Sequence, residues 1–184
     1  DKSYDNYGLG LYPKDRLGEM QYGRIKQRKS YAGSVVDGLS IDQRALFIMQ
    51  KLMKEGGLSP IAAAALTGVW WAESGLNPHI TDRAMQGHPK HEIGQGIAQW
   101  TWERPKMFSR WHQQKYGTPA FPMDTDLNKQ VEYALYEMRP RTQLMSVLRS
   151  TQNLTEAVDA VLRGYENGGT RFTSIEKINQ LYRK

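Results

Sequence analysis

The sequence predicts a mainly α domain that contains one small irregular or β-hairpin segment after its second helix. Apolar residues recur at helical spacings of three and four along most of the chain from residue 40 onward. Residue types that start and stop helices flank these periodic stretches. The longest interruption lies between residues 77 and 99, where glycine and proline are frequent. The sequence has no βαβ alternation and no internal repeat, so neither an α/β fold nor a repeat fold is indicated.

Two parts of the chain differ in composition. Residues 1–39 are rich in glycine and tyrosine and include the basic stretch "RIKQRK", which indicates an N-terminal extension or linker. Residues 40–184 are long enough for one well-buried core and are predicted to form a single domain. Because the chain begins with Asp1 instead of Met, we expect a segment or a processed form of a longer protein. We expect no membrane span and no signal peptide, since no stretch has the required apolar length.

The first two helices have clear start and stop signals. The segment "SIDQ" at residues 40–43 has the spacing of a capping box, and the apolar pattern after it ends at Gly56 and Gly57. Ser59 and Pro60 fit the N-cap and first position of a second helix, which continues through "IAAAALTGVWWAES". A glycine, Gly75, is expected to end it.

The later helices are predicted from the same kinds of signal. Thr101 is expected to cap a helix that runs to Lys115. Pro140 should end a helix with apolar residues over 127–138. A short helix over 144–148 follows, and the segments "NLTE" and "TSIE" open the last two helices.

The composition excludes several kinds of site. The chain has no cysteine, which rules out disulfides, thiolate metal sites and a cysteine nucleophile. His88, His91 and Glu92 lie close together in "GHPKHEIG", but the H-E-x-x-H arrangement is missing and Pro89 disfavours a helix. We therefore expect no metal and no other cofactor. The net charge of +6 suits a polyanionic partner such as a cell-wall polymer, or favours solubility alone.

Glu73 occupies an unusual place in the second helix. It follows Leu66, Val69 and Trp70 at spacings of three and four, so its carboxyl group extends the apolar face at the C-terminal end of the helix. Partial burial and the negative end of the helix dipole both favour the protonated acid, so we expect a raised pKa. A protonated carboxyl group can donate to a leaving oxygen, as cleavage of a glycosidic bond requires. The alternative is an ordinary surface glutamate at a helix end.

Three stretches of the chain resemble a known family. They are "GVWWAESGLNP", "GQGIAQWTWERPKMF" and "VEYALYEM", and they are similar to the phage tail lysozyme family of the lysozyme-like superfamily over about residues 42–169. The pair Glu73-Ser74, the segment "GIAQ" and the segment "GYENGG" also resemble the E-S, G-L-M-Q and A-Y-N-A-G motifs of goose-type lysozymes and lytic transglycosylases. The resemblance implies a lysozyme-like fold and cleavage of the β-1,4 glycan strands of bacterial peptidoglycan. It also implies a place on a phage tail beside other tail proteins.

The same resemblance assigns roles to individual residues. Glu73 would be the catalytic acid, Ser74 and Gln99 would line the substrate groove, and Tyr165 would approach the site from a later helix. Two departures leave the role of Tyr165 open. The stretch between Ser74 and Gly94 is expanded, and Glu-Asn follows Tyr165 where the transglycosylase motif has Asn-Ala.

A second catalytic carboxylate is needed for hydrolysis but not for transglycosylation, in which a hydroxyl of the substrate displaces the leaving group. Asp82 is our first candidate because it lies nine residues after Glu73 in the irregular segment. Glu92 and Glu103 are its rivals, and duty in a turn is its structural alternative. Since an acidic residue is available, we favour hydrolysis over formation of 1,6-anhydro products.

The five tryptophans cluster around the proposed groove. They fall at positions 70, 71, 100, 102 and 111, and we expect about three of them to be core residues. Trp100, beside Gln99, is predicted to form a groove wall.

A different class of function stays open. A basic helical tail component could hold wall polymer or nucleic acid without cutting it, with "RIKQRK" as a contact. Nucleic acid is disfavoured because the basic residues are not interleaved with aromatic residues in a known binding module.

Overall fold

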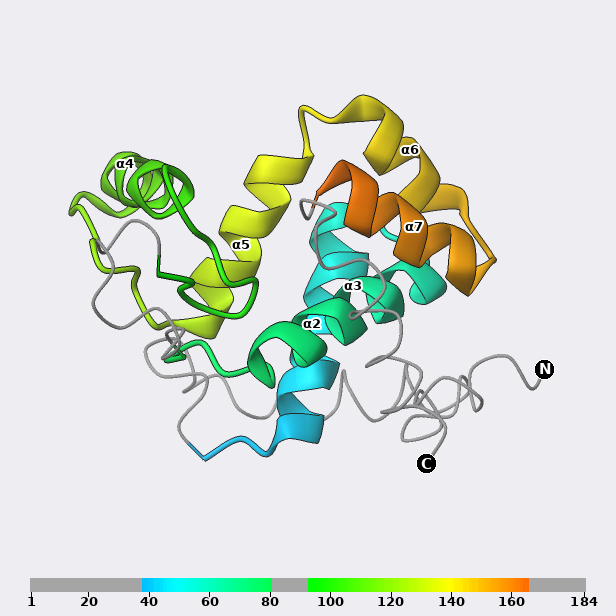
Figure 1. The fold of residues 1–184 in the computed structure, drawn as a ribbon, viewed down its shortest axis with the longest axis horizontal. Coiled ribbons are helices and arrows are strands. Elements are labelled where there is room, and N and C mark those ends of the chain that lie inside the picture. Colours follow the sequence, from blue (N-terminus) through cyan, green and yellow to red (C-terminus); the bar gives the residue numbers. More distant parts are fainter. Residues whose placement is uncertain (1–37, 81–92, 166–184) are drawn as a thin grey trace.

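The computed structural model describes residues 38–80 and 93–165, and within them it is built of helices (Figure 1). The six helices of these residues are α2 (Ile41–Gly56), α3 (Pro60–Ser74), α4 (Arg104–Tyr116), α5 (Leu127–Met138), α6 (Thr142–Ser150) and α7 (Leu154–Gly164). The prediction of a mainly α chain is confirmed. The helix expected after "TSIE" and the N-terminal extension lie outside the described residues.

The first two helices begin and end where their sequence signals predict. Ser40 Oγ accepts a hydrogen bond from the Gln43 amide at 3.2 Å, and the Gln43 side chain accepts one from the Ser40 amide at 3.0 Å, which completes the capping box. Ser59 caps α3 in the same way through the Ala62 amide. Gly75 ends α3 with a φ of +62°, a conformation that costs glycine little.

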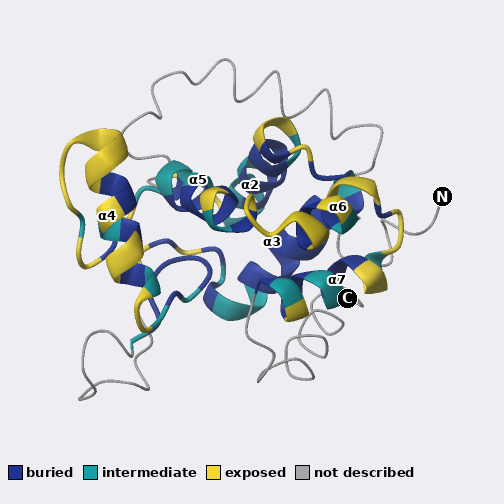
Figure 2. Ribbon diagram, turned by 90° about the horizontal axis from the view of Figure 1, so that it is seen from above, coloured by how far each residue is buried: buried dark blue, intermediate teal, exposed yellow. Residues whose placement is uncertain are grey.

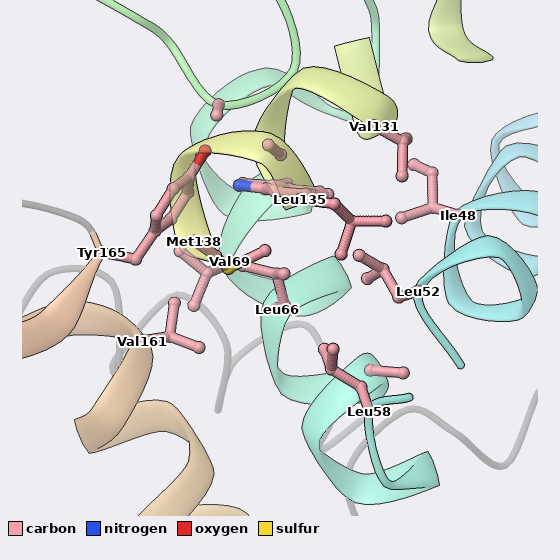
Figure 3. Packing of buried hydrophobic residues seen from close by; sticks show 14 of the residues in the cluster. Ile48, Leu52, Leu58, Leu66, Val69, Val131, Leu135, Met138, Val161 and Tyr165 are labelled. Carbon is pink, nitrogen blue, oxygen red and sulfur yellow. The ribbon is translucent and has the colours of Figure 1, made fainter. Parts of the chain in front are cut away.

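Helix α3 is the centre of the molecule. Every residue from 61 to 70 is buried, and α2, α6 and α7 pack around the helix (Figures 1 and 2). Its run of four alanines leaves room for these neighbours to approach closely. Figure 3 shows Leu66 and Val69 of α3 beside Met138 of α5 and Val161 of α7. Each large apolar side chain buried here contributes about 1.5–3 kcal/mol to folding.

The start of α4 differs from the prediction. The helix begins at Arg104, two residues later than a cap at Thr101 would give, and no side chain caps it. The reason lies at Trp102, whose φ of +57° turns the backbone out of a helical path. Pro105 in the first turn has no amide hydrogen, so one fewer donor needs a partner.

Aromatic side chains join α4 to α5. The ring centroid of Tyr133 in α5 lies 5.1 Å from that of Phe108 and 5.4 Å from that of Trp111, and both of these residues belong to α4. Among the described helices, α4 stands apart from the group formed by α2, α3, α6 and α7, as Figure 1 shows. In the described part of the chain, no helix has the length and apolar character that would let it span a membrane.

Candidate active site

Glu73 lies in the last turn of α3, where the helix leaves the core. The residues before it up to Trp70 are buried, whereas Trp71, Ala72 and Glu73 are half-buried. This matches the position at the edge of the core that its spacing predicts. The next residue, Ser74, is buried and fixes the helix end, because its hydroxyl lies 2.7 Å from the carbonyl oxygen of Ile97 and 2.9 Å from that of Trp70. The backbone beside Glu73 is therefore tied to the loop 94–100.

The loop 94–100 forms a compact turn. Gln95 and Trp100 exchange two backbone hydrogen bonds in an isolated antiparallel bridge, and the described residues of this segment form no longer strand. The Gly96 amide also donates to the carbonyl of Ile80 at 3.1 Å. The irregular segment expected after α3 is thus present in its second half, whereas residues 81–92 lie outside the described residues.

Gln99, expected to line the groove, is half-buried and holds its own loop. Its side-chain amide donates to the Gly96 carbonyl at 2.9 Å, and its backbone has a φ of +52°. Gly94 lies directly against this side chain, because a Cβ atom at that position would be 2.4 Å from Gln99 Oε1. Gln99 shapes the turn whose Ile97 carbonyl accepts the Ser74 hydroxyl, and its contact with substrate stays a prediction.

Gln130 of α5 is a buried residue that the sequence analysis missed. Its Oε1 accepts from the Ile97 amide at 2.9 Å, and its Nε2 donates to the carbonyls of Pro78 at 3.0 Å and Asp124 at 2.9 Å. It joins three loop segments, including the one after α3. A polar residue at helical spacing from Tyr133 and Ala134, which are also buried, was the available signal.

Trp100, which was predicted to form a groove wall, lies in the core of the described residues. Its side chain is fully buried, its indole Nε1 donates to Glu137 at 2.7 Å, and its ring packs edge-on against Tyr133. Trp102, two residues later, is instead 60% exposed. Trp70, Trp100 and Trp111 are buried, so the expectation of three core tryptophans is confirmed.

Tyr165 lies at the end of α7 and contacts the helix that carries Glu73. Its ring meets Trp70 edge-on at a centroid distance of 6.4 Å, and Trp70 lies one helical turn before Glu73. Its hydroxyl donates to Glu137 at 2.8 Å. Figure 3 shows Tyr165 above Val161 and beside Met138, at the edge of the core.

The candidates for a second carboxylate are not brought together here. Asp82 and Glu92 lie outside the described residues, as do His88 and His91. Glu103 has a side chain that is 70% exposed and lies 3.6 Å from Lys106, so it faces solvent. Within residues 38–80 and 93–165, no three His, Cys, Asp or Glu side chains are grouped as metal ligands.

Comparison with known proteins gives one match. A family model described as phage tail lysozyme matches residues 43–180. No curated protein and no solved structure matches the chain.

Proposed function

Because the chain belongs to the phage tail lysozyme family, we propose that it is a muramidase that hydrolyses the β-1,4 bonds between N-acetylmuramic acid and N-acetylglucosamine in peptidoglycan. Membership of this family implies the coarser function, which is lysozyme-like degradation of peptidoglycan. The observation that supports the finer proposal is the position of Glu73, a half-buried residue where α3 leaves the core.

In this proposal Glu73 is the general acid. It donates its proton to the glycosidic oxygen as the bond from that oxygen to C1 of the muramic acid breaks, and the departing glucosamine gains a neutral 4-hydroxyl. A water molecule then bonds to C1 and loses one proton, so the net change is addition of one water across the bond. Asp82 is the proposed group that orients this water and accepts its proton.

Trp102 is the proposed aromatic contact for a sugar ring, in place of Trp100. It is exposed and follows directly on the loop that Ser74 ties to the end of α3. An aromatic ring presents a broad apolar face to the C–H groups of a sugar.

Replacement of the acid tests the proposal. Glu73→Gln removes the proton that the leaving oxygen needs while nearly preserving shape, so cleavage should fall by at least about 10²–10⁴-fold. The measurement is the clearance of turbid, purified peptidoglycan, with circular dichroism to verify folding. Glu156→Gln is the matched control, because the same change at an exposed residue in the first turn of α7 should leave cleavage intact. Near-normal clearance by folded Glu73→Gln would refute the role of Glu73.

The products decide between hydrolysis and transglycosylation. Hydrolysis leaves reducing muramic acid ends, whereas attack by the muramyl 6-hydroxyl leaves 1,6-anhydro ends that are lighter by one water, about 18 Da. Mass spectrometry of the digest separates them. The contact between Tyr165 and α3 is the observation that favours the transglycosylase alternative, since its motif supplies such a tyrosine. Predominantly anhydro products, with Asp82→Asn fully active, would select that alternative.

The proposed setting is a phage tail that acts on the host cell wall, beside other tail proteins. Residues 40–184 would form the catalytic domain and residues 1–39 an extension or linker. Wild-type protein that sediments with peptidoglycan but never cuts it would instead identify a non-catalytic wall-binding component.

A further inference from the structure

We propose that Glu137 is a positioning residue for this reaction: its buried carboxylate holds Tyr165 and the segment from Trp100 to Arg104 against the end of α3. The inference rests on the proposed function and extends it to a residue of α5 that has no assigned role. The carboxyl side chain of Glu137 is only 7% exposed, although it lies among aromatic and apolar neighbours.

Four hydrogen bonds converge on the Glu137 carboxylate from three residues in two other parts of the chain. Its Oε1 accepts from Trp100 Nε1 at 2.7 Å, from the Tyr165 hydroxyl at 2.8 Å and from Arg104 Nη2 at 2.9 Å. Its Oε2 accepts from Arg104 Nε at 3.0 Å. All four partners are donors, so the ionised carboxylate satisfies them and the paired guanidinium offsets the cost of burying its charge.

These contacts reach the neighbourhood of Glu73 by two routes. In the first, Glu137 holds Trp100, whose loop carries the Ile97 carbonyl that receives the Ser74 hydroxyl. In the second, Glu137 holds Tyr165, whose ring packs on Trp70, one turn before Glu73. Replacement of Glu137 would therefore disturb the contacts that hold the chain on both sides of Glu73, the proposed acid.

Two arginine side chains also confine the ring of Tyr165. The Arg104 guanidinium lies 5.0 Å from the ring centroid and that of Arg141 lies 5.5 Å from it. What Glu137 adds is the direction of the phenolic hydrogen. The phenolic hydrogen is thus directed to the carboxylate, and the ring that meets Trp70 is held with it.

A buried ion pair is weak evidence for stability, because apolar residues of similar volume often serve a core as well. Orientation of polar groups is different, since an apolar residue cannot supply it. Displacement of catalytic groups by about 1 Å can cost on the order of 10²-fold in rate. The expected signature of Glu137 is therefore a loss in kcat rather than in folding.

The experiment measures kcat and KM on soluble, uncross-linked glycan strands, well below the unfolding temperature of each variant. Glu137→Gln turns an N–H group toward the donors of Arg104, so kcat should fall about ten- to a hundredfold while KM stays within about twofold. Glu137→Asp keeps the charge and should recover part of the loss. The matched control is Glu132→Gln on the same helix, because Glu132 pairs with Lys115 and Tyr116 instead. That control should lower the unfolding temperature and leave kcat unchanged.

The outcomes separate this inference from the proposed function. A wild-type enzyme that cuts glycan, with folded Glu137→Gln at wild-type kcat, would overturn the positioning role alone. A loss of kcat that Glu132→Gln reproduces at equal loss of stability would overturn it too. An inactive wild type would overturn both. If Glu137→Gln does not fold, Arg104→Lys carries the test, because lysine keeps the charge but cannot form the paired hydrogen bonds. A wild-type kcat in that variant would then count against the role.

Discussion

At the scale of single residues, the contact between Gly96 and Gln130 shapes the loop beside Glu73. Gly96 has a φ of +72°, and a Cβ atom there would lie 2.7 Å from Gln130 Oε1. The side chain it would strike cannot move aside without cost, because Gln130 is fully buried and bonded to three backbone groups. Both the conformation and the space at this position therefore require glycine.

Replacement of Gly96 by alanine should reveal both requirements. Gly117 is the matched control, since its φ is +82° but nothing lies within 4 Å of a Cβ atom there. Gly117→Ala should lower the free energy of unfolding by about 1–2 kcal/mol through its backbone alone. Gly96→Ala should cost about 1–3 kcal/mol more through overpacking. Urea unfolding measures both, and equal losses would contradict the close contact with Gln130.

The proposed contact of Trp102 with a sugar ring can be tested by removing this one side chain. Trp102→Ala should raise KM for glycan strands about two- to tenfold, the equivalent of roughly 0.5–1.5 kcal/mol for one aromatic contact. Tyr136→Ala provides a control, because Tyr136 is likewise exposed but belongs to α5. Isothermal titration of an inactive Glu73→Gln background isolates binding. Equal affinities for both alanine variants would remove Trp102 from the proposed site.

Sequence reasoning located some of these residues and missed others for a physical reason. The place of Glu73 at the edge of the core follows from helical spacing, which is a local property. The direction in which Gln99 and Trp100 point depends on partners far along the chain, such as Gln130 and Glu137. No local pattern carries that information.

At the scale of elements, the same contrast separates helix ends from helix partners. The caps at Ser40 and Ser59 were predictable because each cap bonds to a residue three positions away. The start of α4 was not, because an aromatic residue at positive φ is uncommon and leaves no sequence signal.

Carboxylates join helices α2, α4 and α5. We therefore predict that the free energy of unfolding falls at acidic pH. Burial is the largest single effect and raises the pKa of Asp124 and Glu132. The hydrogen bonds and positive charges around each group, with Lys129 first for Asp124 and Lys115 first for Glu132, together outweigh burial, so both pKa values lie below the ordinary range. Each folded pKa is lower than in the unfolded chain, so this stabilisation is complete near neutral pH. It is lost as pH falls through about 4 toward the folded values.

The measurement is the urea midpoint between pH 7 and pH 3. The midpoint should fall with acid in the wild type, and it should fall less steeply in Glu132→Gln, which has no proton to gain at this position. Identical slopes would show that Glu132 does not contribute.

At the scale of the whole molecule, the core is organised around α3, and Leu39 is the first of the described residues that packs against it. We predict that a chain beginning at residue 38 folds and cleaves peptidoglycan like the full chain, because it keeps Ser40 as the cap of α2. Thermal unfolding and turbidity clearance of the two forms provide the comparison. A large loss of stability in the shorter chain would assign residues 1–37 to the folded domain instead of to an extension.

The separate position of α4 has a consequence for local unfolding of the molecule. Amide hydrogens in α3 can exchange with solvent only when the whole core opens, because neighbours surround that helix. Helix α4 is attached on one side, to α5, through aromatic contacts and ion pairs, so its amides can exchange through a smaller, local opening. The loop 94–100 beside Glu73 is bonded to the end of α3 and leads along the chain into α4. For the proposed glycan substrate, a side that opens locally beside a rigid one would let a long polymer enter without threading its end.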